Sequence, residues 1–209
     1  MKTTMIRRLP AAVALCLATG GIAIAASAPV VPVPPAAAQP APHAASNVLE
    51  EGITKLNLFI ASGQARDPAA LTRFVDETIK PFFDFERMAA LAAGPTWQQM
   101  NDEQKARFRQ RIEQMFLNAF IRNVVSHRGP PPLVQFLPPR PSRDASRIDL
   151  LARVLLPKQK PRRLVFRFAK SGDKWRVFDV SVDGKSAVLY YRSHFMKLAR
   201  EGGIPAMLR

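Results

Sequence analysis

Cysteine, histidine and acidic residues are scarce in this chain of 209 residues. The single cysteine, Cys16, excludes a disulfide framework, and it excludes metal sites and iron–sulfur clusters that need several cysteines. The three histidines, His43, His127 and His194, are scattered along the sequence rather than grouped as metal ligands. Only 16 Asp and Glu oppose 31 Lys and Arg, and this formal charge of +15 favours anionic partners such as lipid headgroups, nucleic acid or an acidic protein.

Recognisable catalytic motifs are also missing. The sequence contains no G-x-S-x-G elbow, no H-E-x-x-H zinc motif and neither of the glycine-rich phosphate-binding motifs. Asp84 is interpreted as a helix cap, and Asp179 as the partner of an arginine on a neighbouring strand. A composition of 47% hydrophobic residues is enough for a real core. We therefore expect a binding protein rather than an enzyme, with no cofactor and no bound metal.

The N-terminus has the layout of a secretory signal peptide. Lys2, Arg7 and Arg8 precede an apolar run over 9–28, and small-x-small triplets follow it. We expect residues 1–28 to be the signal peptide, with cleavage somewhere between 25 and 38. An uncleaved membrane anchor is the alternative, but this run is at the short end of the roughly 20 residues that a spanning helix needs. Export argues against nucleic acid as the partner.

The rest of the chain divides into a linker and one domain. Over 29–45, prolines alternate with Ala and Val, a composition that favours an extended, disordered segment. Residues 46–209 form the predicted single domain. Apolar periodicity, together with the capping residues Asp67 and Asp84 and the capping box of Asn101 with Gln104, predicts helices over 48–63, 68–81, 85–92, 101–127 and 187–200.

Strand patterns occupy the stretch between the last two helices. Runs rich in Val, Leu, Ile and Phe, separated by Pro or Gly-Asp turns, predict strands over 133–137, 146–156, 162–169 and 174–182. Their short connections favour an antiparallel meander. The predicted class is therefore α+β, with an N-terminal helical layer, an antiparallel sheet of about four strands and a C-terminal helix.

Two stretches of the sequence resemble the MlaC family of periplasmic lipid carriers, also called toluene-tolerance proteins. The first is FVDETIKPFFDFERMA over 74–89, followed by Gly94, Trp97, Glu103-Gln104 and Phe108. The second is WRVFDV over 175–180, followed by Asp183-Gly184, Ser186, Tyr191-Arg192-Ser193, Phe195, Gly202-Gly203-Ile204 and Leu208. The two stretches stand in the family's order and at its spacing.

The resemblance implies a periplasmic protein whose helical layer wraps a curved sheet around an apolar pocket for phospholipid acyl chains. It also implies two protein partners, an inner-membrane ABC transporter with an MCE-domain subunit and an outer-membrane lipoprotein complex. On this basis the expected lining consists of Phe83, Met88, Phe108, Ile112, Met115, Phe116, Phe166, Phe168, Val177 and Tyr191. Basic stretches around 105–111 and 158–163 are expected to be docking surfaces.

Three alternatives stay open at this point. The cargo could be a hopanoid or another lipid that is not a phospholipid, because nothing in these residues separates a ring system from two acyl chains. An exported enzyme acting on lipid or cell-wall material would need a reactive constellation built from residues interpreted here as structural. An interaction module with a completely filled core would bind an acidic partner through its basic face.

Overall fold

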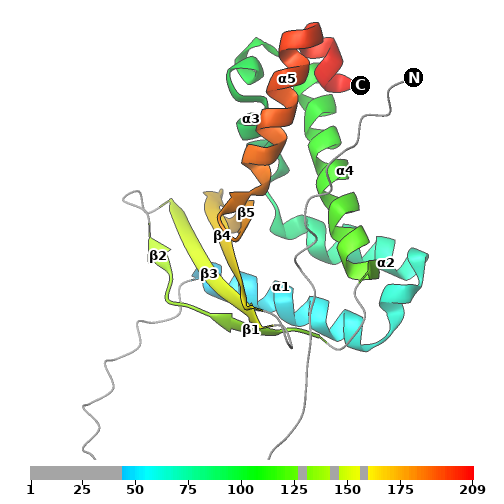
Figure 1. Ribbon diagram of the computed structural model, residues 1–209, viewed down its shortest axis with the longest axis vertical. Coiled ribbons are helices and arrows are strands. Elements are labelled where there is room, and N and C mark those ends of the chain that lie inside the picture. Colours follow the sequence, from blue (N-terminus) through cyan, green and yellow to red (C-terminus); the bar gives the residue numbers. More distant parts are fainter. Residues whose placement is uncertain (1–43, 127–130, 142–145, 156–159) are drawn as a thin grey trace, which may run out of the picture.

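The computed structural model describes residues 44–126, 131–141, 146–155 and 160–209. The predicted signal peptide, and the linker as far as residue 43, lie outside these ranges. Helices occupy the beginning and the end of the described chain, and the strands lie between them (Figure 1). The α-helices are α1 (Ala44–Ala61), α2 (Pro68–Phe74), α3 (Phe85–Ala93), α4 (Asp102–Ser126) and α5 (Ala187–Leu208).

The predicted starts of α2, α3 and α4 are confirmed by their capping hydrogen bonds, whereas α1 begins at Ala44, earlier than predicted. The Asp67 carboxylate accepts from the backbone N–H of Ala69 at 2.9 Å, and Pro68 occupies the first position of α2. The Asp84 carboxylate caps α3 in the same way. Before α4, the Gln104 side chain accepts from the N–H of Asn101 at 3.0 Å, and the Asn101 side chain accepts from the N–H of Gln104 at 2.8 Å. This reciprocal pair is the predicted capping box.

Two helices differ from the prediction in their interiors. The helix predicted over 68–81 keeps α-geometry only to Phe74, and then continues as the π-helical turn η2 (Val75–Ile79) and the 3-10 turn η3 (Lys80–Phe82). A further 3-10 turn, η4 (Gly94–Gln99), was not predicted. In α5 the helical dihedrals stop at Gly202, and Gly203 has a positive φ of 63°, which glycine adopts without steric cost. The predicted break at this glycine pair is confirmed, although one helical turn follows it.

The sheet is a mostly sequential antiparallel meander. Its strands are β1 (Leu133–Phe136), β2 (Arg140–Pro141), β3 (Arg147–Leu155), β4 (Arg162–Ser171), β5 (Lys174–Val182) and β6 (Lys185–Ser186). They follow the order β1-β3-β4-β5-β6, and β2 also pairs with β3. The four long predicted strands are confirmed, while the two-residue strands β2 and β6 were not predicted. The sequence prediction of an α+β fold is therefore correct.

A β-bulge in β5 changes which residues share a face of the sheet. Arg167 stands opposite Asp179, whereas the next residue of β4, Phe168, stands opposite Val177. Phe178 is thus the extra residue of the bulge. As a result, Val177 and Val180 lie on the same face of the sheet although their spacing along the strand is odd.

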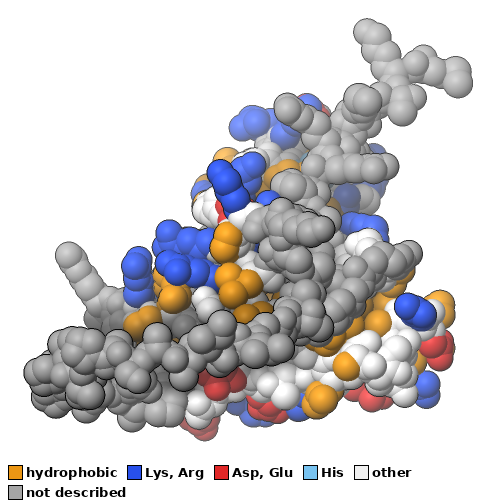
Figure 2. All heavy atoms as spheres, turned by 60° about the horizontal axis from the view of Figure 1, so that its bottom comes forward, with side chains coloured by type: hydrophobic (Ala, Val, Ile, Leu, Met, Phe, Trp, Pro, Cys, Tyr) orange, Lys and Arg blue, Asp and Glu red, His pale blue; other side chains and the backbone are white. Residues whose placement is uncertain are grey.

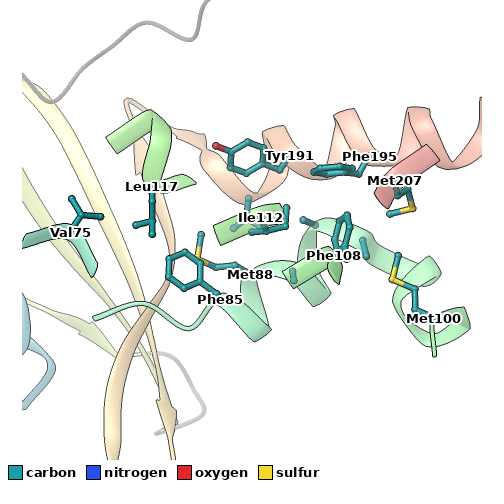
Figure 3. Close-up of a cluster of buried hydrophobic side chains, with 14 of the residues drawn as sticks. Val75, Phe85, Met88, Met100, Phe108, Ile112, Leu117, Tyr191, Phe195 and Met207 are labelled. Carbon is teal, nitrogen blue, oxygen red and sulfur yellow. The ribbon is translucent and has the colours of Figure 1, made fainter. Parts of the chain in front are cut away.

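The helices divide into two groups (Figure 1). Helix α1 packs against one face of the sheet, where Ala45 and Leu49 join a buried cluster with Ile148, Leu150 and Phe168. Helices α3, α4 and α5 pack on one another, and in Figure 3 the side chains of α5 point toward those of α3 and α4. Within the described ranges, no helix combines the length and the apolar character that a membrane span requires.

Candidate functional site

The buried apolar residues form three separate clusters. The helical core, which includes Met88, Phe108, Ile112 and Phe195, joins the helices. The sheet core consists of Ala45, Leu49, Ile148, Leu150, Phe168, Trp175 and Val177. The end cluster consists of Ala152, Val154 and Leu164. A domain of this size usually has one contiguous core, so the boundaries between these clusters are informative.

Two half-buried phenylalanines connect the three clusters. Phe83 packs against both the helical core and the sheet core, and Phe166 packs against both the sheet core and the end cluster. Neither ring is fully enclosed. We use the name apolar seam for Phe83 and Phe166 together with five half-buried apolar side chains that each pack against one of the clusters, namely Ile53, Phe116, Val134, Val180 and Val182.

The exposure pattern along β4 places the seam at the middle of the sheet. Leu164, Phe166 and Phe168 alternate on the face that α1 covers. Leu164 is 3% exposed and Phe168 is 0% exposed, but Phe166 between them is only half-buried. In a completely filled core the central residue would be the most enclosed of the three. The protein therefore leaves apolar surface accessible at the centre of this face.

Backbone contacts fix the position of Phe83 where the helices meet the sheet. Phe83 forms a bridge with Val177 of β5, and the next N–H, of Asp84, donates to the Val177 carbonyl at 2.8 Å. From α4, the Phe116 ring approaches the Phe83 ring with their centroids 4.7 Å apart. These contacts hold two aromatic rings of the seam between the helical core and the sheet.

Charged groups lie around the apolar surfaces and not among the seam residues. In Figure 2, Lys and Arg side chains gather beside hydrophobic side chains in the left half of the view, whereas most Asp and Glu side chains lie along the lower edge. At one end of β4, the Arg162 guanidinium pairs with Asp183 at 2.9 Å. Within the described ranges, no group of three His, Cys, Asp or Glu residues is placed to hold a metal ion.

A buried carboxylate ties the sheet to α5. Asp179 is 2% exposed, and it accepts hydrogen bonds from Arg167 at 2.6 Å, from the Ser186 hydroxyl at 2.7 Å and from the N–H of Val188 at 3.1 Å. Ser186 and Val188 hold the first turn of α5 against β5, and Arg167 links β5 to β4, so Asp179 has a structural role. The predicted pairing of Asp179 with an arginine is confirmed.

Comparison with known sequences decides the family. A sequence model described as MlaC protein matches residues 52–209, which is most of the chain. The chain belongs to the MlaC family. The resemblance predicted from the two sequence stretches is thereby confirmed.

A solved structure has the same MlaC-type fold. It is a phospholipid-binding protein from Ralstonia solanacearum in complex with a phospholipid, with 19% sequence identity and a TM-score of 0.67. The match covers 78% of this chain and 91% of the other. At this identity the likeness establishes a shared fold. No protein with a curated description matches the chain.

The lining residues expected from the MlaC resemblance fall into three environments. The helical core contains Met88, Phe108, Ile112 and Tyr191, all buried, and Met115 is half-buried against it. The sheet core contains Phe168 and Val177. Only Phe83, Phe116 and Phe166 belong to the seam. The Tyr191 phenol lies deep enough that burial, as the main cause, raises its pKa above the ordinary value.

Sequence reasoning missed four seam residues, Ile53, Val134, Val180 and Val182. Simple alternation along β5 assigns Val180 to the face opposite Val177, because it does not reveal the bulge at Phe178. Phe178 itself packs against the helical core, and the Arg87 guanidinium lies 5.8 Å from its ring. Ile53 had a visible signal, since it lies on the predicted apolar face of the first helix.

Proposed function

We propose that this MlaC-family protein binds the acyl chains of a phospholipid along the apolar seam and carries the lipid through the periplasm between the two membranes. The observation that carries this proposal is the half-buried Phe166 between two fully buried neighbours on β4. The fold likeness to the Ralstonia protein that was solved with a phospholipid supports it.

The energetics of acyl chains explain why such a protein needs accessible apolar surface. Burial contributes about 0.8 kcal/mol per methylene, so a chain of roughly 16 carbons represents on the order of 13 kcal/mol relative to water. A carrier must offset nearly all of that cost while the lipid is away from the bilayer. Aromatic and branched side chains such as Phe83, Phe166 and Val180 provide this surface without buried polar groups that would need partners.

In this proposal the seam residues contact the lipid, and the helical core supports the wall behind them. Met115 precedes Phe116 on α4, and its flexible thioether would adapt to chains of different length. The closed packing around Phe108 and Ile112, each 0% exposed, gives these residues a supporting role. Of the residues expected from the sequence, only Phe83, Phe116 and Phe166 belong to the proposed lining, with Met115 beside them.

Partners would give the transport its direction. Pocket and bilayer hold acyl chains with comparable free energy, and the sequence contains no nucleotide-binding motif of its own. An inner-membrane ABC transporter with an MCE-domain subunit and an outer-membrane lipoprotein complex are the proposed partners. The predicted signal peptide over 1–28 would deliver the protein to the compartment between them.

The test compares two half-buried phenylalanines on neighbouring strands, one in the seam and one outside it. The mature protein and the variants Phe166→Asp and Phe178→Asp are purified without detergent, examined by native mass spectrometry and then extracted for lipid identification. We expect the mature protein and Phe178→Asp to carry phospholipid at a defined stoichiometry, and Phe166→Asp to lose it while keeping its circular dichroism spectrum.

Each outcome of the lipid measurement tests a different part of the proposal. Phospholipid retained by Phe166→Asp at the wild-type level would contradict the seam as the binding site. A mature protein that is empty, and that gains no lipid from vesicles, would overturn the proposed function. Release of a hopanoid instead would keep the carrier and change the class of cargo.

A further inference from the structure

Two arginines face each other across the sheet. Arg153 of β3 stands directly opposite Arg163 of β4, and both side chains are exposed. Directly opposed side chains on antiparallel strands lie about 5 Å apart at Cβ, and like charges at such positions destabilise the sheet. This pair therefore works against the stability of the isolated protein.

The nearby acidic residues are engaged by other arginines. Arg167 pairs with Asp179 at 2.6 Å and with Asp149 at 3.9 Å, while Arg162 pairs with Asp183 at 2.9 Å. The Asp183 carboxylate also accepts from the backbone N–H of Arg163 at 3.0 Å, but among the residues that the structure describes none pairs a carboxylate with the guanidinium of Arg153 or Arg163. Local costs of this kind are expected where a surface serves a partner, and two adjacent guanidinium groups fit an anionic one.

One exposed and one half-buried leucine accompany these arginines. Leu133 of the edge strand β1 is 55% exposed and stands directly opposite Leu155 of β3. Leu155 and Arg153 are two residues apart on β3 and therefore lie on the same face. We call Leu133, Arg153, Leu155 and Arg163 the basic sheet face. Leu150 of β3 and Phe168 of β4 pack under α1. Arg153 and Arg163 are an odd number of residues away from them along the same strands, so the basic sheet face is the face that α1 does not cover.

We propose that the basic sheet face docks the protein onto an anionic lipid bilayer. Guanidinium groups would contact lipid phosphates, and the exposed leucine would enter the boundary between headgroups and acyl chains. An acidic protein partner would satisfy the charge, but a charged protein surface offers no complement to Leu133. The net charge of +15 favours the same kind of surface. This inference goes beyond the proposed function, since docking requires no bound cargo.

The experiment measures cosedimentation with vesicles made of equal parts phosphatidylcholine and phosphatidylglycerol. The variant Arg153→Glu/Arg163→Glu is compared with the control Arg66→Glu/Arg73→Glu, which changes the net charge equally at exposed arginines of the helical half, outside the basic stretch 105–111. One basic residue near an anionic surface changes binding by about fivefold, so we expect a loss on the order of 25-fold or more for the sheet variant. The control should lose no more than a few-fold. High salt screens the charges and leaves the apolar contribution dominant. Leu133→Ser should therefore weaken vesicle binding by a larger factor at high salt than at low salt.

Several results would overturn this proposal. Equal losses in both double variants would mean that net charge, and not this face, attracts the vesicles. A wild-type protein that ignores anionic vesicles would leave an acidic protein as the partner of the basic sheet face. If the glutamates disturb the sheet, as circular dichroism would show, Arg153→Gln/Arg163→Gln removes the charge alone and should still reduce binding.

Cargo measurements separate this inference from the proposed function. We expect Arg153→Glu/Arg163→Glu to retain its extractable phospholipid while losing vesicle binding. A wild-type protein that binds vesicles but carries no lipid would overturn the carrier and leave the docking surface intact.

Discussion

The helical core and the apolar seam are built from the same kinds of side chain but packed to different extents. Met88, Phe108, Ile112 and Phe195 of the helical core are all 0% exposed (Figure 3). Phe83 and Phe166 of the seam are only half-buried. Completed packing gives the helical core its contribution to stability, whereas the seam keeps apolar surface available. The difference teaches that stability and binding rest on different parts of this fold, and mutations can separate them.

The largest effect should come from emptying the centre of the helical core. The Phe108 ring contacts the Phe195 ring edge-on, with centroids 4.8 Å apart, and Trp97 lies beyond it at 6.5 Å. Phe108→Ala leaves a cavity that its neighbours cannot fill, so we expect it to lower the free energy of unfolding by about 3–5 kcal/mol. Urea denaturation measures this loss. The folded fraction should still retain its lipid.

The matched change in the seam is Phe166→Ala. Because part of the Phe166 side chain is already accessible, we expect a smaller stability loss than at Phe108, about 2–3 kcal/mol, together with weaker lipid retention. The contrast between the two regions would be wrong if Phe166→Ala cost as much stability as Phe108→Ala and left the lipid in place.

The loss expected at the carboxylate that joins the two halves is no larger than that at Phe108. Asp179→Ala removes the acceptor shared by Arg167, Ser186 and Val188, and hydrogen bonds that involve a charged group are each worth about 1.5–3 kcal/mol. Because Arg167 is partly exposed and can turn to water, the bonds to Ser186 and Val188 account for most of the effect, and we expect a total loss of about 3 kcal/mol, the lower end for two such bonds, in thermal or urea unfolding.

Asp149 provides the control for this prediction. It lies 3.9 Å from the same arginine but is 46% exposed, so Asp149→Ala should cost less than about 1 kcal/mol. Equal losses at the two carboxylates would show that the Arg167 charge, and not the link to α5, determines the stability of this joint.

The sequence was sufficient for the elements whose signals are local. Capping residues such as Asp67, Asp84 and Asn101 determine where helices begin through bonds to N–H groups two or three residues away. Runs of Val, Leu, Ile and Phe between turn signals predicted β3, β4 and β5 for the same reason. The family was also within reach, because its motifs are contiguous stretches of sequence.

The seam was only partly within reach, because its residues are defined by what does not pack against them. Phe108 and Phe116 have the same character on one helical stripe, yet the first is closed in by α5 and the second faces Phe83. No pattern along α4 distinguishes them, since the difference depends on the neighbouring elements. Val180 was missed because one bulge residue exchanged the faces of β5.

The smallest predicted effect concerns pH, and it distinguishes the two regions chemically. His194 lies on α5 beside Phe195 of the helical core, with ring centroids 5.0 Å apart. Burial, and then the charges of Arg111 and Lys197, lower its pKa below the ordinary value of 6.5. The unfolded chain therefore binds a proton more readily than the folded one, and stability should fall as the pH drops below about 6.5.

His194→Gln should reduce this pH dependence, which thermal melts between about pH 7.5 and about pH 5.5 would measure, since this window spans the ordinary histidine pKa. The effect should be small because the His194 side chain is largely exposed. Every seam residue is apolar, so lipid retention by the folded wild-type protein should stay constant over the same window. A lipid occupancy that falls with pH in parallel with the melting temperature would mean that the helical core and the seam are coupled after all. Tight packing of the helical core would then contribute to holding the lipid in the seam.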